Sequence, residues 1–277
     1  MRLYKALILL PLLACSSTPP DTVALCGADA GADAAQPDAS EQRRIVAIIG
    51  PSNADGLGNS TLVPDYIDAY PAVTLKQRRA GGATNPIPWV DTSNAPLAPR
   101  CLGPNCFGVE LSLGRALDAA NPGLWSVTKL VIDGSGLNQH WRPGATYPSG
   151  GTPLHTQLMT WLAESEAELS GKLAAVVIIQ GERDALYAAT SAAFQADQEA
   201  QIAAIQAVYP DAIFLLNRLH AQTSPAYNSV VRAAQEAQTG VTLVDIDDLS
   251  LKGDLVHFTP ATYITLGERF ASAYLSP

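Results

Sequence analysis

Short apolar runs alternate with longer amphipathic segments from Arg43 to the end of the chain, and this alternation restricts the fold more than any other feature. The first run, residues 44–49, consists of Ile, Val and Ala after an initial Arg. A strand that is buried on both faces of a parallel sheet has such a sequence. Similar runs occupy 127–132, 175–179, 212–216 and 241–244. Helical patterns are found at about 110–120, 154–170, 188–208 and 226–238, and a last helix is expected from Pro260, a favourable first-turn residue, to Tyr274.

This order of strands and helices predicts a parallel sheet with helices on both faces. Five strands in one unit indicate a three-layer α/β/α domain of the flavodoxin-like type. No change of composition and no linker divides residues 43–277, so we expect one domain there. Ligands of open parallel sheets bind at the carboxyl ends of the strands. The loops that follow the strands are therefore the segments in which to look for chemistry.

The first residues have the layout of a signal peptide. Arg2 and Lys5 precede an apolar run from Ala6 to Ala14 that is too short to span a bilayer. The run ends in Leu-Leu-Ala-Cys15, which resembles the lipobox of bacterial lipoproteins. That resemblance implies removal of residues 1–14 and a diacylglycerol on Cys15. We expect an exported lipoprotein anchored at the periplasmic or outer cell surface. An ordinary secretory signal is the alternative, and it also implies export.

Residues 15–42 are the expected tether between the lipid and the domain. Their small and acidic residues, as in the stretch 28–35, offer no apolar face to bury, so we expect the segment to be disordered. The chain has a formal net charge of −9 and no basic cluster. A nucleic-acid partner is disfavoured because it requires a positive face. The same charge disfavours docking to an anionic membrane, which leaves the lipid anchor as the expected membrane contact.

Three cysteines follow Cys15. Cys101 and Cys106 enclose Leu-Gly-Pro-Asn, a turn-like insert that can bring two sulfur atoms together. In an oxidising compartment we expect them to form a disulfide, with Cys26 unpaired in the tether. A zinc site is the alternative, but no second pair of ligands stands at a suitable spacing.

Two of the loops after strands contain candidate catalytic residues. Gly50-Pro51-Ser52-Asn53 follows the first strand and places a serine hydroxyl at the mouth of the sheet. Asp254 and His257 lie in the last loop, where their spacing lets the carboxylate meet one imidazole nitrogen and leaves the other to accept a proton. Such a pair can activate a serine. Taken separately, the features also fit a plain Ser/Asn turn and a helix-entry Asp beside a surface His.

The other three histidines compete for the role of the base. His220 follows the strand at 212–216, but no Asp lies near it in the sequence. His155 falls in the first turn of a predicted helix, where a surface or capping role is the simpler interpretation. His140 lies in the glycine-rich segment 134–144, which fits a substrate wall better than a base.

The third strand is followed by Gln180-Gly181-Glu182-Arg183-Asp184. An amide at Gln180 can donate a hydrogen bond to negative charge that develops on a carbonyl oxygen. Glu182 and Asp184 can be interpreted as the paired carboxylates of a glycosidase, or as residues that orient neighbouring loops. The chain lacks the Gly-x-Gly-x-x-Gly fingerprint, the P-loop lysine and the His-Glu-x-x-His pattern, so a dinucleotide site, a P-loop and a common zinc peptidase are unsupported.

Together these blocks resemble the SGNH-hydrolase superfamily, and within it the sialic-acid-specific acetylesterase and carbohydrate esterase family six branch. Residues 50–53 are similar to the Gly-Gln-Ser-Asn block of that branch, and the Asp-x-x-His block matches Asp254 and His257. Three further blocks, in the same order, match 107–117, 134–144 and 180–184. The resemblance covers about residues 43–277, and five ordered blocks are far more specific than any one of them.

The resemblance implies roles for the matching residues. Ser52 would be the nucleophile, His257 the base and Asp254 the residue that orients the base. The oxyanion would be held by the backbone N–H groups of Ser52 and Gly108 and by the Gln180 side chain, and each such donor lowers a barrier by about 3–4 kcal/mol. No metal and no organic cofactor is implied. Substrate-binding or supporting roles fall to Asn53, Glu110, Gly134, Trp141 and Glu182.

Two residues depart from the pattern of the branch. Pro51 replaces the usual glutamine, which removes an amide and a backbone N–H beside the nucleophile. Ile179 replaces the histidine that often precedes Gln180. The α/β-hydrolases share the order Ser, Asp, His, but their Gly-x-Ser-x-Gly elbow follows several strands, and Ala54 stands here in place of its second glycine.

The sequence therefore predicts a surface-anchored esterase that removes O-acetyl groups from a carbohydrate through an acyl-serine intermediate. One alternative is an esterase for short acyl groups on other, non-carbohydrate compounds. A second is a glycan-binding lipoprotein that has no catalytic activity.

Overall fold

The computed structural model describes residues 42–80, 90–101, 105–146 and 151–276. The expected signal peptide, Cys15, Cys26 and the tether up to residue 41 lie outside the described residues and stay predictions. Within the described ranges, no helix is both long and apolar enough to cross a bilayer.

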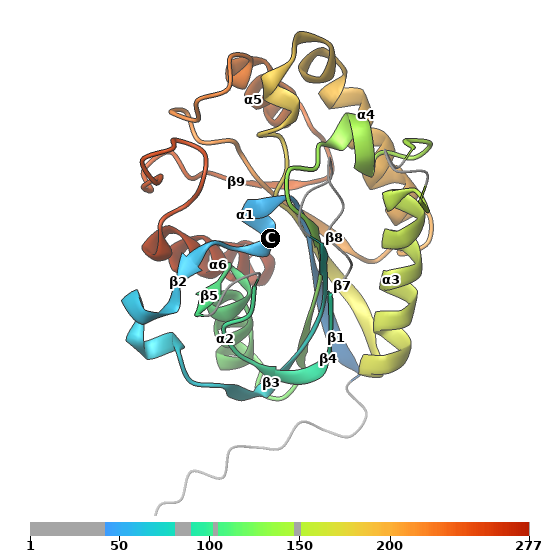
Figure 1. The fold of residues 1–277 in the computed structure, drawn as a ribbon. Helices are drawn as coiled ribbons and strands as arrows, with labels where there is room; N and C mark the ends of the chain where they lie inside the picture. Colours follow the sequence, from blue (N-terminus) through green and yellow to red (C-terminus); the bar gives the residue numbers. More distant parts are fainter. Residues whose placement is uncertain (1–41, 81–89, 102–104, 147–150, 277) are drawn as a thin grey trace, which may run out of the picture. The chain divides into compact units, whose positions relative to one another are not determined.

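A seven-stranded sheet forms the centre of the domain, with the strand order β4-β3-β6-β1-β7-β8-β9 (Figure 1). The predicted α/β fold class is confirmed, because the five expected strands pair in parallel and are flanked by helices. These strands are β1 (Arg43–Gly50), β6 (Trp125–Ile132), β7 (Gly171–Ile178), β8 (Ile213–Asn217) and β9 (Thr242–Val244). The expected helices are α2 (Glu110–Ala120), α3 (Leu154–Leu169), α4 (Ala188–Gln206), α5 (Asn228–Glu236) and α6 (Pro260–Leu275).

The predicted number of five strands is wrong, because β3 (Tyr70–Ala80) and β4 (Val90–Leu97) extend the sheet beyond β6. β3 runs parallel to β6, and β4 is antiparallel to β3. Four consecutive polar residues, 76–79, interrupt the apolar pattern of β3. They are tolerated because they have partners: the Lys76 ammonium lies 3.0 Å from Glu168 and 4.2 Å from the centre of the Trp161 ring.

Several short elements surround the carboxyl ends of the strands. A single helical turn, α1 (Ser52–Asp55), follows β1, and a π-helical turn, η3 (Leu137–Trp141), follows β6. The remaining short elements are β2 (Gly58–Asn59), η1 (Ser60–Leu62), η2 (Pro64–Tyr66), β5 (Cys106–Phe107) and η4 (Asp184–Leu186). β2 and β5 pair as a separate antiparallel ribbon, and the Cys101–Cys106 disulfide holds the start of β5.

The side chains of β1 show why the sheet is covered on both faces. Ile45, Ala47 and Ile49 belong to the core under α3, α4 and α5, whereas Val46 and Ile48 belong to the core under α2 and α6. Figure 1 shows α3 and α4 on one side of the sheet and α2 and α6 on the other. Burial of each large aliphatic side chain contributes about 1.5–3 kcal/mol. The central strand is thus fixed from both faces, and its carboxyl end is a rigid base for the loop that follows.

Two glycines allow this loop to pack directly against backbone. Gly50 has φ of 145°, and a Cβ atom there would lie 1.9 Å from the Ile179 carbonyl oxygen. Gly56 has φ of 92°, and its Cβ atom would lie 2.3 Å from the Gly108 Cα atom. Any side chain would force these segments apart and would also be strained at positive φ. The turn between the two glycines therefore has a fixed position.

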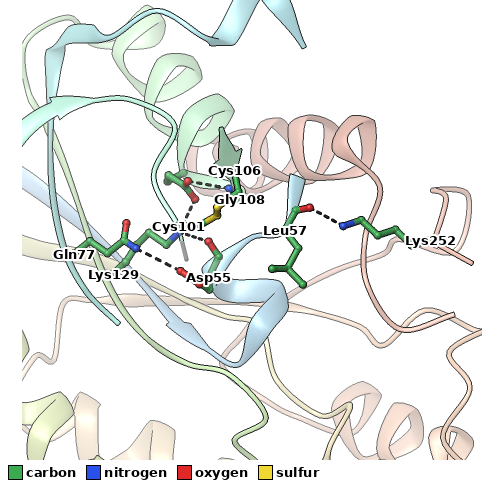
Figure 2. Close-up of a disulfide and its surroundings, with 9 residues drawn as sticks. Asp55, Leu57, Gln77, Cys101, Cys106, Gly108, Lys129 and Lys252 are labelled. Carbon is green, nitrogen blue, oxygen red and sulfur yellow. Dashed lines mark hydrogen bonds and ion pairs between the residues drawn. A yellow bond between two sulfur atoms is a disulfide. The ribbon is translucent and has the colours of Figure 1, made fainter. Parts of the chain in front are cut away.

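A buried group of charges lies beneath this turn (Figure 2). The Lys129 ammonium donates to the Glu110 carboxylate at 2.8 Å and to the Asp55 carbonyl oxygen at 2.8 Å. Both side chains of the ion pair are fully inaccessible. The second oxygen of Glu110 accepts the Gly108 N–H at 2.9 Å. One ion pair thus joins β6, α1 and the start of α2.

Asp55 is the carboxylate of this group that has no cation in direct contact. Gln77 donates to one of its oxygens at 3.4 Å, and the other buried oxygen has no hydrogen-bond partner. Burial raises the pKa of Asp55 to about 7, and the nearby Lys129 charge only partly opposes this. Asp55 therefore carries a proton over much of the acidic range.

We expect Lys129→Met to lower the free energy of unfolding by about 3–5 kcal/mol, because it leaves the Glu110 carboxylate buried without a cation. Urea unfolding measures this. The matched control is Lys172→Met, since the Lys172 side chain is 66% exposed and its ammonium lies 3.9 Å from Glu166. The control should change stability by less than about 0.5 kcal/mol. Equal effects of the two substitutions would show that the buried pair adds nothing to stability.

Asp55→Asn should flatten the pH dependence of stability. Because the folded-state pKa of about 7 lies above the ordinary value of 3.8, the folded protein retains a proton that the unfolded chain has lost between these pH values. The stability that Asp55 contributes is therefore complete below pH 3.8 and is lost as the pH rises to about 7. Urea unfolding from pH 4 to pH 7 (about the two pKa values) should give a smaller decline for the variant. Parallel curves for the two proteins would contradict this.

Candidate active site

Ser52, His257 and Asp254 form a continuous hydrogen-bonded chain. Ser52 begins α1 directly after β1, and its Oγ atom lies 2.9 Å from His257 Nε2. The other ring nitrogen, His257 Nδ1, lies 2.6 Å from Asp254 Oδ2. The structure thus brings Ser52 next to Asp254 and His257, which lie about 200 positions later in the sequence. The order carboxylate, imidazole, hydroxyl is that of a serine-hydrolase triad.

The Asp254 carboxylate is held by its own loop. Its second oxygen accepts the backbone N–H groups of Val256 and His257, both at 2.9 Å. Partial burial opposes ionisation, but the hydrogen bonds from the His257 ring and from these two N–H groups lower the pKa of Asp254 to about 2. An ionised carboxylate beside Nδ1 favours the proton on that nitrogen. Nε2 is then free to accept the Ser52 proton.

Asn53 connects the serine loop to the histidine loop. Its amide nitrogen donates to Glu182 Oε1 at 2.7 Å and to the Val256 carbonyl at 3.0 Å. Its amide oxygen accepts the Phe258 N–H at 3.2 Å and the Tyr263 hydroxyl at 3.0 Å. Asn53 thus forms hydrogen bonds with Val256 and Phe258, the two residues on either side of His257. Asn53 has a supporting position, and its hydrogen-bonding capacity is fully used within the protein.

Lys252 makes a second connection between the same loops. Its ammonium donates to the Leu57 carbonyl at 2.6 Å, and its backbone N–H donates to the His257 carbonyl at 2.7 Å (Figure 2). Sequence reasoning missed this residue, because a lone lysine in a polar loop carries no local signal of its partner.

The Ser52–His257 pair opens into a cavity of about 430 Å³, here named the first cavity. Five apolar residues line it, namely Pro51, Leu57, Leu186, Pro225 and Val256. The other polar lining residues are Asp133, Gly134, Ser135, Glu182, Arg183 and Ser224. Pro51 and Val256 directly precede Ser52 and His257 in the chain, so the cavity offers apolar as well as polar groups around the pair.

The expected role of Gly108 in the oxyanion hole disagrees with its contacts. The Gly108 N–H already donates to the Glu110 carboxylate, and Gly108 does not line the first cavity. Gly134, the second residue after β6, does line the first cavity. Its N–H makes no hydrogen bond to another described residue. The same is true of the Ser52 N–H. Glu110 itself supports the site from below through Gly108 and Lys129, as described above.

Gln180 and Glu182 follow β7 beside the serine loop. β1 and β7 are in register up to Ile49 and Ile178, which places Gln180 close to Pro51. Both polar atoms of the Gln180 side chain are buried and have no hydrogen-bond partner. Like Gly108, however, Gln180 does not line the first cavity. Burial raises the pKa of Glu182, although the hydrogen bond from Asn53 opposes the rise. Its second oxygen is buried without a partner.

Two further residues after β6 shape the first cavity. Asp133 lines it, and burial raises the pKa of its carboxyl, although the charges of His257 and Arg79 oppose the rise. Sequence reasoning missed Asp133, yet the strand-end rule applies to it, because the residue directly follows the expected strand 127–132. Ser135 lines the cavity and accepts the Trp141 ring N–H at 2.7 Å. Trp141 is fully buried, so it supports the wall and does not form it.

The competing candidates lie elsewhere. His140 is bonded to the backbone of its own turn. His220 donates from Nε2 to the Leu249 carbonyl and accepts the Gln222 N–H at Nδ1. Asp184 accepts the N–H groups of Leu137 and Asn138 and thereby orients the turn η3. This contact fits the interpretation of Asp184 as a residue that orients a neighbouring loop. In the described part of the chain, no three His, Cys, Asp or Glu side chains gather in a way that would hold a metal ion.

Known proteins resemble this chain in family and in fold. Residues 42–276 match the family model of carbohydrate esterases described as sialic acid-specific acetylesterase. No curated protein matches the sequence. An Arabidopsis thaliana protein of known structure has a TM-score of 0.66 and 19% identity, with 85% of this chain and 98% of that chain covered.

Two other solved structures share the fold. NanS has a TM-score of 0.61 and 13% identity over 85% of this chain and 97% of its own. A carbohydrate acetylesterase from Xanthomonas citri has a TM-score of 0.58 and 18% identity over 83% of this chain, which spans 55% of that protein. These likenesses concern the fold. The family model covers nearly all described residues, and the chain therefore belongs to the carbohydrate esterase family of sialic acid-specific acetylesterases.

Proposed function

We propose that the protein is a serine esterase that removes O-acetyl groups from a carbohydrate through an acyl-serine intermediate on Ser52. The observation that carries this proposal is the hydrogen-bonded chain from Ser52 through His257 to Asp254 at the first cavity. Membership of a carbohydrate esterase family supports the reaction class. The Xanthomonas citri neighbour is described as a carbohydrate acetylesterase, which supports the substrate class.

In the first half of the reaction, His257 Nε2 takes the proton of Ser52 Oγ while Oγ attacks the ester carbonyl carbon. The tetrahedral intermediate then collapses as the bond to the sugar oxygen breaks. His257 returns the proton to that oxygen, so the sugar leaves as an alcohol. Asp254 remains ionised throughout, because its pKa of about 2 lies far below neutral pH, and it stabilises the imidazolium.

In the second half, His257 removes a proton from water, which attacks the acetyl-serine carbonyl. Ser52 Oγ leaves and recovers its proton from His257, and acetate is released. The negative charge on the carbonyl oxygen in both halves needs donors, which we assign to the N–H groups of Ser52 and Gly134, two residues that line the first cavity. Each donor that is free of other partners is worth about 3–4 kcal/mol at the transition state.

The apolar lining residues of the first cavity fit the acyl group. Pro51 lies directly before the nucleophile and lines the cavity together with Leu57 and Val256. The turn forms with proline at this position, and the Pro51 carbonyl accepts the N–H groups of Ala54 and Asp55. The replacement of glutamine thus exchanges a polar wall group for an apolar one and leaves the turn intact.

The first test is hydrolysis of p-nitrophenyl acetate by the wild type, Ser52→Ala and His257→Ala. We expect both substitutions to lower kcat by at least about 10³-fold, because each removes a member of a unit that acts together. Acetate release from O-acetylated sugars should disappear in parallel. Unchanged hydrolysis by folded Ser52→Ala protein would overturn the serine mechanism. Binding of acetylated glycans without turnover by the wild type would favour the glycan-binding alternative.

Asn53→Ala should lower kcat by about 10- to 100-fold and leave KM largely unchanged, because it releases both neighbours of His257. The matched variant is Tyr263→Phe, which removes one of the four hydrogen bonds to Asn53 and leaves the bonds to the histidine loop. We expect Tyr263→Phe to lower kcat by less than about threefold. Steady-state kinetics at fixed pH, with thermal melting to verify folding, provide the comparison. Equal losses in the two variants would argue against positioning by the Asn53 amide.

A further inference from the structure

A second cavity of about 570 Å³ adjoins the first one, and nothing in the reaction proposed above uses it. Residues of the π-helical turn η3, including Asn138, Gln139 and His140, line it together with Arg142 and Arg183. We propose that this second cavity binds the sugar ring next to the acetylated ring, so that the substrate is an oligosaccharide. The proposal rests on the function proposed above and extends it.

The two cavities adjoin each other at Arg183, which lines both of them. The chain after β6 also contributes to both, with Gly134 and Ser135 in the first cavity and Asn138 and Gln139 in the second. A ligand whose ester group reaches Ser52 can therefore place its next ring against Arg183 and the turn η3.

The turn that lines the second cavity is held in place before any ligand binds. The buried Asp184 carboxylate accepts the N–H groups of Leu137 and Asn138 at 2.8 and 3.0 Å. The Asn138 amide donates to Asp197 at 2.6 Å, which ties the turn to α4. Trp141, fully buried, is bonded to Ser135 from below. A preorganised surface loses little conformational entropy on binding, which favours specific contacts.

The second cavity offers hydrogen-bond donors. Arg183 Nε donates to Gln139 Oε1 at 3.1 Å, which orients both side chains. The two terminal nitrogens of Arg183 and the amide nitrogen of Gln139 make no hydrogen bond to any residue that the structure describes. Arg142 Nε donates to the Asn138 carbonyl and lies 3.7 Å from Asp197, which fixes its guanidinium at the rim. Oxygen-rich ligands accept hydrogen bonds from such groups, and an acyl chain cannot.

The contrast between the cavities indicates which part of the substrate each one takes. The first has five apolar residues in its lining, including Pro51 beside the nucleophile, whereas the second is lined mainly by amide, guanidinium and other polar side chains. Each volume, about 430 and 570 Å³, is in the range of pockets that hold small organic ligands. The acetylated ring therefore fits the first cavity and a hydroxyl-bearing neighbour the second. A monosaccharide ester would leave the second cavity without a ligand.

The test compares three substrates: p-nitrophenyl acetate, a mono-O-acetylated monosaccharide, and a disaccharide with the same acetylated ring. We expect kcat/KM of the wild type to be about tenfold higher for the disaccharide than for the monosaccharide, the effect of two neutral hydrogen bonds. In the double variant Gln139→Ala, Arg142→Gln this ratio should fall to about 1. The matched control is Gln195→Ala, Arg269→Gln, which removes an amide and a guanidinium from α4 and α6 and should retain the ratio of the wild type.

A second measurement needs no variant. The deacetylated disaccharide should inhibit hydrolysis of p-nitrophenyl acetate by the wild type about tenfold more strongly than the deacetylated monosaccharide. Equal rates and equal inhibition for the two sugars, with p-nitrophenyl acetate still hydrolysed in a Ser52-dependent manner, would overturn the second subsite alone. A disaccharide preference that the double variant retains would also overturn it. Loss of all hydrolysis would instead overturn the proposed esterase, and the subsite with it.

Discussion

The Asn53 side chain is the contact on which the arrangement of the candidate site depends. Its amide joins the serine loop at one end of the central strand to the residues on either side of His257 and to Glu182 after β7. Asn53, Glu182 and Phe258 are buried, and in a buried site an unpaired amide or carboxylate costs more than a hydrogen bond gains. Moving the serine loop away from the histidine loop would leave these buried polar groups unpaired, and this cost stabilises the geometry of nucleophile and base. The proposed chemistry needs such preorganisation, because small displacements of reacting atoms reduce rates strongly.

Beneath this contact, the fold supplies rigidity by two different means. The central strands are buried on both faces by apolar side chains, whereas the turn that carries Ser52 is held by backbone packing at Gly50 and by the Lys129–Glu110 pair. The buried pair occupies the Gly108 N–H, which turns a candidate oxyanion donor into a structural group. Gly134, after the neighbouring strand, lines the cavity in its place. A charge pair that stabilises the domain thus also decides which backbone groups face the substrate.

Much of the fold was predictable because buried strands and amphipathic helices have local periodicity. β3 and β4 were not, since Lys76 and the polar residues after it are compatible with a strand only when Glu168 and Trp161 are present as partners. In the site, Ser52, Asp254 and His257 were recognisable from strand ends and short spacing. Lys252 was not, because its side chain acts through a contact with Leu57, about 200 residues away in the sequence.

The sequence by itself determined the alternating α/β architecture, the family and the residue types of the triad, because each of these is encoded in short segments. Tertiary structure decided which backbone N–H groups are already in use, which carboxylates are buried, and how the two cavities adjoin each other at Arg183. Hydrogen-bond partners, burial and cavity walls come from segments that are distant in the chain. Their effect on pKa values and on substrate access exists only after those segments pack together.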